Sequence, residues 1–250
     1  MAAPTWVQNP ASGADANATS TTLAFGSNVT AGNSIFVGIR IGATDRTITV
    51  SDTLSNTYGG SPGTVGDVAQ TQTTDGHRTY LFSAHNIAGG ACTVTVAISG
   101  AAATIRFNIG EGSFGGTASL DKTASAEGSG TDPASGNTAT TTIDDELVVG
   151  VASNAAATAW TAGGTYTERG NAPADPNGRT AMETLIVAAT GVQNATWTIT
   201  GTKTWAAVVG TYGIAGGGEP PLTWLPRYDA IRGRTVRIVP SGFNPGTKVD

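Results

Sequence analysis

Short runs of β-branched and aromatic residues, each bounded by Gly, Asn, Asp or Ser, recur along the chain. The two most apolar runs are residues 34–41 (SIFVGIRI) and 146–153 (ELVVGVAS), which lie about 110 residues apart. Runs of this composition favour strands that are covered on both faces or lie on the inner face of a sandwich. We therefore predict that these two segments are the central strands of a β-sandwich.

Other segments repeat the strand pattern more weakly. The pair Asp75–Gly76 separates two alternating runs, which indicates a hairpin. Residues 179–189 have a spacing that also fits a helix, but we predict a strand because the matching segment of the first half is one. Residues 11–20 and 110–137, rich in Ala, Ser and Gly, are predicted as irregular. The remaining predicted strands are 5–8, 21–25, 65–73, 78–84, 47–51, 92–98, 103–109, 138–143, 195–200 and 204–214.

The two halves of the chain resemble each other in order. SIFVGI matches ELVVGV, RTYLFSA matches RTAMETLIVAA, CTVTVAIS matches ATWTIT, and TIRFNI matches WAAVVGTY. Two interlocked sets of four strands form a jelly roll. Two side-by-side sandwiches are the alternative, but we prefer one domain, because the match covers only four segments in each half, fewer than the roughly seven strands of an independent sandwich. We predict an all-β fold: one antiparallel jelly-roll β-sandwich over residues 1–215, followed by an extended C-terminal arm over 216–250.

Composition narrows the classes of function. Only 12% of residues are charged, Gly numbers 35 of 250, and the net charge is −5, which disfavours nucleic acid as a partner because phosphate binding needs clustered Lys and Arg. No apolar run of about 18 residues is present, so we expect no membrane span. The N-terminus has no basic and apolar export signal, so we expect release by lysis. The single cysteine, Cys92, is expected to be a small buried side chain.

Residues 216–250 differ from the rest of the chain. They carry five Lys and Arg against three acids, while residues 1–215 carry eight against fifteen. Apolar anchors accompany the positive charge, so this composition is not that of a disordered tail. One interpretation is a last strand on its own domain, and the other is an arm that docks on a neighbouring subunit, with TVRIV (235–239) adding to a sheet edge. The predicted partner-binding residues are Trp224, Leu225, Arg227, Tyr228, Ile231, Arg232, Arg234, Val236, Arg237, Ile238 and Phe243.

Catalytic and metal-binding motifs are absent from the sequence. His77 and His85 have no GxSxG serine to act on, and HExxH and CxxC do not occur. We therefore expect no enzyme, no catalytic residue and no metal site. Loop acids such as those at 144–146, together with Asp121 and Asp132, leave Ca²⁺ as the only cofactor considered.

Glycan-active chemistry would need two facing carboxylates. Glu111, Glu168 and Glu183 qualify only because they lie in predicted strands. Glycan binding without catalysis would use exposed rings that stack on sugar faces, and we assign Trp6 and Trp205 to packing instead. The possible glycan-binding residues are Tyr58, Trp160, Tyr166 and Trp197.

Six segments within residues 5–214 carry a resemblance to a known group of proteins: TLAFGSNVTAGNSIFVGI, TVSDTLSNTYGG, RTYLFSAHNIAGGACTVTV, ELVVGVAS, WTAGGTYTERG and TWAAVVGTY. With these segments the chain resembles jelly-roll (concanavalin-like) phage virion surface or decoration proteins and related bacterial β-sandwich modules. That resemblance implies a fold and transfers no binding residue. Many proteins of that group are virion surface or decoration proteins. Together with the lack of a catalytic constellation, the lack of an export signal and the distinct composition of 216–250, this leads us to expect a non-enzymatic structural protein on the virion surface. We expect a capsid decoration or fibre protein that is a homo-oligomer on the particle and is held by the major capsid or another virion protein. The alternative is a carbohydrate-binding module or receptor-binding fibre domain that contacts cell-surface glycans.

Overall fold

The structure is a computed structural model that describes residues 3–10 and 13–214. The predicted arm and its partner-binding residues lie outside these described residues. Within them the fold is all-β, and every strand pair is antiparallel. No helix in the described part of the chain has the length and apolar character to span a membrane.

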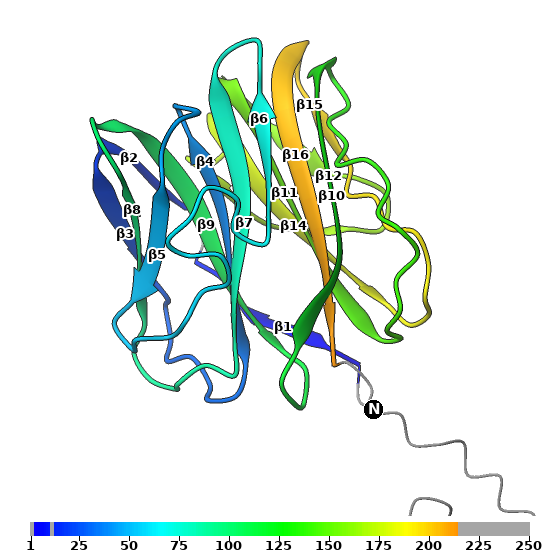
Figure 1. The fold of residues 1–250 in the computed structure, drawn as a ribbon. Coiled ribbons are helices and arrows are strands. Elements are labelled where there is room, and N and C mark those ends of the chain that lie inside the picture. The colour runs from blue at the N-terminus through cyan, green and yellow to red at the C-terminus, as the bar shows by residue number, and fades with distance from the viewer. Residues whose placement is uncertain (1–2, 11–12, 215–250) are drawn as a thin grey trace, which may run out of the picture. The chain divides into compact units, whose positions relative to one another are not determined.

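The first half of the chain forms two sheets (Figure 1). One has the strand order β1-β9-β4-β7-β6, with β2 also paired to β9, and the other has the order β3-β8-β5. These strands are β1 (Thr5–Gln8), β2 (Ala14–Ala18), β3 (Ser20–Ala24), β4 (Ser34–Ile41), β5 (Ile48–Asp52), β6 (Val68–Gln72), β7 (His77–His85), β8 (Thr93–Ile98) and β9 (Ala103–Ser113).

The second half repeats this arrangement. Its larger sheet has the order β10-β16-β11-β14-β13, and β12 pairs with β15 in a smaller one. These strands are β10 (Ser119–Gly130), β11 (Glu146–Thr158), β12 (Trp160–Ala162), β13 (Thr167–Ala172), β14 (Gly178–Val187), β15 (Trp197–Ile199) and β16 (Lys203–Gly213).

The repeat seen in the sequence is therefore a repeat of topology. β4 lies between β9 and β7, and β11 lies between β16 and β14. In the outer layers β8 lies between β3 and β5, while β15 pairs with β12 on one side. On its other side, Trp197 N donates to Pro133 O at 2.9 Å and Ile199 N donates to Thr131 O at 2.8 Å.

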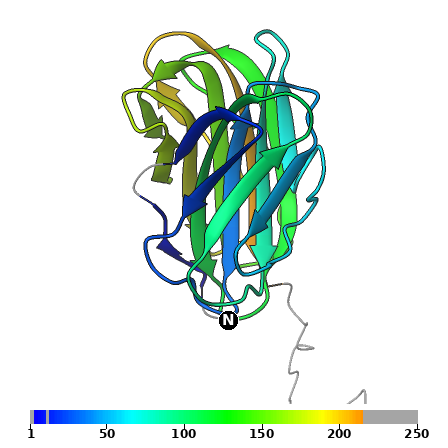
Figure 2. The ribbon, with the colours of Figure 1, turned by 90° about the vertical axis from the view of Figure 1, so that its left-hand side faces the viewer.

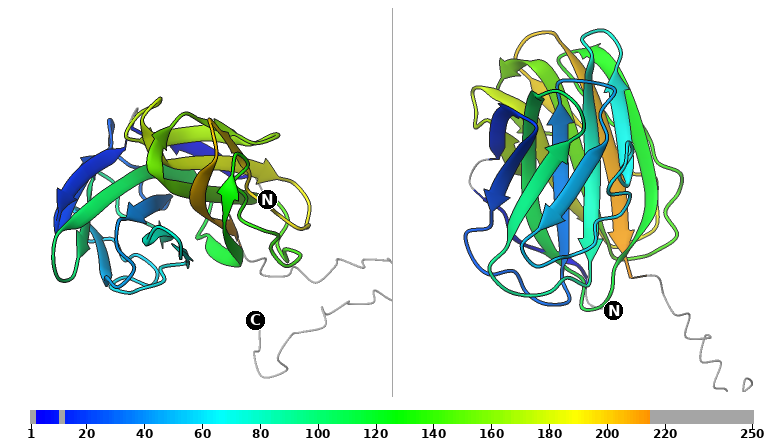
Figure 3. Two further views of the ribbon diagram at one scale, coloured as in Figure 1. Left: turned by 90° about the horizontal axis from the view of Figure 1, so that it is seen from above. Right: turned by 60° about the vertical axis from the view of Figure 1, so that its left-hand side comes forward.

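The prediction of an antiparallel all-β sandwich is confirmed, and its jelly-roll topology is not. Every strand pair joins strands of the same half, so the two strand sets are not interlocked. The arrangement corresponds to the alternative of two sandwiches, which Figures 1 and 3 show side by side, the first half in blue to green and the second in green to orange. The prediction gave no strand to 11–20, 110–137 or 160–172, where β2, β10, β12 and β13 lie, and it placed a strand at 138–143, where the structure has none.

Two segments predicted as irregular contain β2 and β10. β10 has only half-buried and exposed positions, and its residues are mostly Ala, Ser, Thr and Gly, so no apolar periodicity marks it. It is fixed by pairing with β16 from Ser119↔Gly213 to Gly130↔Lys203. β2 is likewise small and polar (ADANA) and pairs with β9. Their structure depends on a neighbouring strand, which overrides their weak local preference.

Three apolar cores separate the layers. The first core lies between the two sheets of the first half, whose outer sheet β3-β8-β5 faces the viewer in Figure 2. The third core lies between the large sheet of the second half and β12-β15. The middle core joins the two halves, and its buried residues are Phe36, Val68, Leu81, Phe114, Ala118, Leu147, Val149, Val151, Met182, Val208 and Tyr212.

The middle core brings the halves close together at one glycine. Phe36 of β4 meets Tyr212 of β16 edge to face, with ring centroids 4.8 Å apart. Two residues along β4, a Cβ placed on Gly38 would lie only 2.7 Å from Val151 Cγ2 and 3.0 Å from Met182 Cε. A side chain at residue 38 would thus push against the other half of the protein.

We expect Gly38→Val to lower the free energy of unfolding by about 1–3 kcal/mol, because the added methyl groups overpack the middle core. Gly26→Ala is the matched control, since a Cβ at Gly26 meets nothing within 4 Å. Chemical denaturation of both variants measures the difference. Equal stabilities of Gly38→Val and the wild type would contradict the close packing of the two halves.

Candidate functional site

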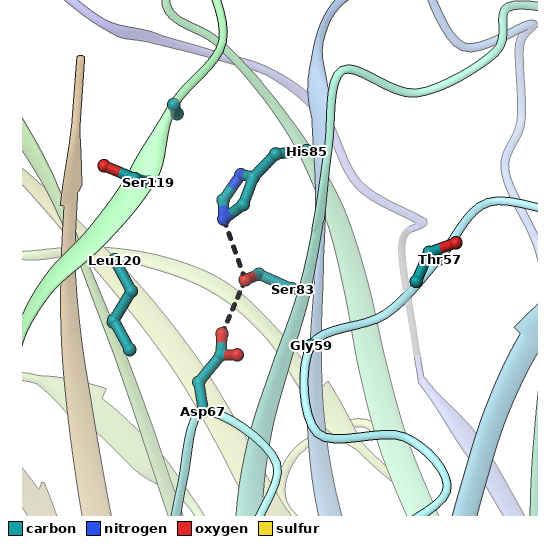
Figure 4. Close-up of a pocket in the computed structure, with 8 residues that line it drawn as sticks. Thr57, Gly59, Asp67, Ser83, His85, Ser119 and Leu120 are labelled. Carbon is teal, nitrogen blue, oxygen red and sulfur yellow. Dashed lines mark hydrogen bonds between the residues drawn. The ribbon is translucent and has the colours of Figure 1, made fainter. Parts of the chain in front are cut away.

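A pocket lined by both polar and apolar residues opens where the middle core ends. It has a volume of about 360 Å³ and is bounded by β7, by the loop before β6 and by the start of β10 (Figure 4). Residues from both halves thus form its wall. Its lining residues are Thr57, Gly59, Asp67, Ser83, His85, Ala118, Ser119 and Leu120.

Strand alternation places the polar residues of this pocket. Residues 81, 83 and 85 of β7 share one face, and Leu81 on that face belongs to the middle core. Ser83 and His85 continue the same row beyond the apolar contact. Asp67 directly precedes Val68, another member of the middle core, so its carboxylate lies at the edge of the apolar layer.

A continuous chain of hydrogen bonds links these side chains. Ser83 Oγ donates to Asp67 Oδ2 at 2.5 Å, and Tyr212 Oη donates to the same oxygen at 2.8 Å. His85 Nε2 lies 3.0 Å from Ser83 Oγ, and His85 Nδ1 lies 2.9 Å from Ser34 Oγ. Tyr212 comes from the second half, so this network also bonds the halves together.

The direction of these bonds determines the proton positions. The carboxylate only accepts, so the single hydroxyl proton of Ser83 goes to Asp67. Ser83 Oγ must then accept from His85 Nε2–H, and His85 Nδ1 accepts from Ser34. In a Ser-His-Asp triad the imidazole accepts the serine proton and the carboxylate holds the imidazole. Here the serine lies between the acid and the imidazole, so His85 is not positioned as its base.

Burial controls the charges of this network. It raises the pKa of Asp67 to about 6, although the hydrogen bonds from Ser83 and Tyr212 oppose the shift. Burial also lowers the pKa of His85 to about 4. At pH 7 the pocket therefore holds an ionised carboxylate and a neutral imidazole.

The predicted glycan-binding rings lie elsewhere. Trp160 and Trp197 are 3% and 2% exposed and meet edge to face in the third core, with centroids 6.4 Å apart. Tyr58 is buried in the first core and donates to Asp52 Oδ2 at 2.8 Å. Tyr166 is half-buried against the third core. The prediction that these rings are exposed is wrong for Tyr58, Trp160 and Trp197, because their apolar faces pack in the cores.

Two of the predicted carboxylates are neighbours. Glu168 of β13 and Glu183 of β14 are directly opposite each other. Glu183 is fully buried, and its two carboxylate oxygens accept from the backbone N–H groups of Thr196 at 3.0 Å and Gly163 at 3.3 Å. It therefore holds the outer layer in place and faces no cleft. Glu111 lies in the first half, where it accepts from Gln8, Asn33 and the backbone of Thr30.

The loop acids considered for Ca²⁺ include one close pair, because burial and then the neighbouring Asp121 raise the pKa of the buried Glu146 to about 7. Asp121 accepts hydrogen bonds from Lys122 and Thr142, Asp132 accepts from Thr131, and Asp144 accepts from the backbone of Thr190. Among residues 3–10 and 13–214, no three His, Cys, Asp or Glu side chains form a group that could hold a metal ion.

The sequence interpretation missed Asp67 and Ser83 and treated His85 as a polar strand end. The available signal was the alternation in β7, where Ser83 and His85 share with Leu81 a face that also carries His77 and Thr79, although the strand is largely buried. A polar pair at such positions indicates either a buried network or a pocket. Comparisons with protein families, curated proteins and solved structures find no match to this chain.

Glu183 generates a pH prediction. Burial raises its folded pKa to about 9, above the value near 4.5 of an unfolded chain, so the folded protein binds the extra proton and stability is lost as pH rises between these values. We expect the free energy of unfolding of the wild type to fall relative to that of Glu183→Gln as the pH rises from 6 to 8.5, by up to about 1.4 kcal/mol per pH unit. Denaturation curves at several pH values measure it.

Asp45→Asn is the control for that experiment, because the Asp45 side chain is 72% exposed. A stability difference between wild type and Glu183→Gln that stays constant over the range would show that Glu183 is ionised in the folded state.

Proposed function

We propose that this protein is a non-enzymatic structural protein of a phage virion, a capsid decoration or surface fibre protein that is attached through residues 216–250. The observation that carries the proposal is the contrast within the chain. Residues 216–250 hold five Lys and Arg against three acids, and the rest holds eight against fifteen. A positively charged segment with apolar side chains that follows an acidic body is suited to binding another protein.

The architecture of the described residues supports a structural role. Two sandwiches share a buried apolar contact, so they form a compact unit with three cores. The aromatic residues considered for sugar binding serve these cores instead. The network of Asp67, Ser83 and His85 lacks the order of bonds that would activate the serine. Each of these features favours packing and attachment over catalysis.

The chain enters the attachment segment from the seam between the halves. β16 ends at Gly213, and the next residue, Ile214, packs against the middle core, as does Trp6. In the proposed mechanism, the apolar and Arg side chains of 216–250 bury in grooves between coat subunits, and TVRIV adds to a sheet edge.

Attachment of this kind gains strength from repetition. Ordering the segment on binding costs free energy, which lowers the affinity of a single copy. Many copies on a symmetric particle, or an oligomer that engages several sites together, raise the effective affinity without further contacts. The proposed partner is thus the major capsid protein or another regularly repeated virion protein.

Deleting residues 216–250 is expected to leave a folded body that no longer binds the particle. Co-sedimentation with particles stripped of the protein measures attachment, and circular dichroism checks the fold. We expect at least a tenfold loss of affinity, about 1.4 kcal/mol.

A full-length chain in which Trp224, Arg237 and Phe243 are replaced by Ser controls for length. Weakened binding by this variant would attribute attachment to the anchors. Full occupancy of particles by the truncated protein would overturn the proposal.

A further inference from the structure

One oxygen of the Asp67 carboxylate is unused by the protein. Ser83 and Tyr212 both donate to Oδ2, and Oδ1 has no donor among the described residues. Figure 4 shows the carboxylate with a hydrogen bond on one oxygen only. Oδ1 lies beside Gly59, where an added Cβ would come within 2.7 Å of it. A side chain at residue 59 would therefore press against Oδ1, and glycine avoids this contact.

The negative charge of this carboxylate has no protein counter-ion. The ion pairs of the described residues lie at Asp45, Asp75, Asp15 and Asp121 and do not include Asp67. The titratable groups that face Asp67 are His85 from β7 and Tyr212 from β16. His85 is neutral because burial lowers its pKa to about 4, and burial raises the pKa of Tyr212 well above its usual value. A half-buried charge without a partner favours a cationic ligand.

The other lining groups limit what that cation can be. Ala118 and Leu120 supply apolar surface, and Leu120 is 38% exposed. Thr57 and Ser119 also line the pocket, with their hydroxyl groups directed away from Asp67 (Figure 4). A volume near 360 Å³ is at the small end of ligand pockets.

We propose that this pocket binds a primary ammonium group carried on a short aliphatic chain, with the ammonium on Asp67 Oδ1 and the carbon chain against Ala118 and Leu120. An ammonium is a compact charge that can donate to a single acceptor, so one free carboxylate oxygen matches it. A guanidinium fits less well, since its paired donors need both carboxylate oxygens and Oδ2 already accepts twice. Ca²⁺ would require six to eight oxygen ligands, many more than one carboxylate supplies.

Such an ammonium group has two sources, a free alkylamine or the lysine side chain of another protein. Both present the same chemistry to Asp67. A lysine would make the pocket a docking point for a neighbouring protein, and a free amine would make it a small-molecule site. The experiment therefore includes a probe for each.

The test uses the full chain and follows the ring protons of its two histidines by NMR. His85 lines the pocket, and His77 is an internal reference because it is 1% exposed and paired with Asp75. The probes are n-butylammonium and Nα-acetyl-lysine N-methylamide, with n-butanol and n-propylguanidinium as comparison ligands. We expect both ammonium probes to shift His85 and leave His77 unchanged, with an affinity about tenfold above that of the alcohol or the guanidinium.

Asp67→Asn should lower the ammonium affinity at least tenfold, and the exposed Asp45→Asn should leave it unchanged. Affinity in the wild type should fall as pH drops below about 6, where Asp67 takes up a proton. Tighter binding of the lysine probe would indicate a protein source, and tighter binding of butylammonium a free amine.

Equal affinities for butylammonium and butanol, or no shift of His85 at probe concentrations up to about 100 mM, would overturn the proposal. This comparison uses only the wild type, so it stands even if Asp67→Asn fails to fold. Loss of particle attachment on deleting residues 216–250 would be a separate result, because the pocket lies wholly within the body.

Discussion

The structure depends on the apolar contact between its two large sheets. Each of these sheets is covered twice, once by its own outer layer and once by the other half. A sheet with two covered faces needs apolar residues at successive positions, since no face is left for alternating polar ones. This explains why residues 34–41 are buried throughout and why 146–153 are as well. The two most apolar runs of the chain are central because they lie in the two innermost layers.

The same constraint accounts for where the polar chemistry lies. Inside the contact, Phe36, Leu81 and Val149 leave no room for charge. At its edge the face of β7 turns polar, and Asp67, Ser83 and His85 form a hydrogen-bonded chain that reaches Tyr212 in the other half. Burial beside the apolar layer gives this carboxylate its raised pKa and leaves it without a counter-ion. The pocket is thus a consequence of how the two halves meet.

Much of this fold follows from sequence patterns. The bounds of β1 and β4 match their predictions, and β6 and β7 pair across Asp75–Gly76 as the turn indicates. The repeat also predicts which strands are central. β2 and β10 could not be found in this way, because their small polar residues become strands only beside β9 and β16. The choice between two sandwiches and one interlocked sandwich could not be predicted either, because it depends on which strands pair across long distances in the sequence.

The sequence also does not show which face of the sheet each strand residue occupies. Matching SIFVGI to ELVVGV aligns Gly38 with Gly150, yet a Cβ on Gly38 would meet Val151 of the other half and one on Gly150 would meet Ala195 of its own outer layer. A shift of one residue exchanges the faces of a strand, so similar runs can point opposite ways. The aromatic residues were misplaced for a related reason. A ring near a turn, such as Trp160, is buried or exposed according to what covers it, and β15 covers this one.

The central claim is that the middle core makes the two halves one cooperative unit. Native-state hydrogen exchange of the β4 and β11 amides, measured against denaturant concentration, tests it most directly. Both strands should exchange only through global unfolding, with the same opening free energy and the same denaturant dependence. Exchange of one strand at a lower free energy and with a smaller dependence, while the other stays protected, would show that the halves unfold separately and would contradict the account.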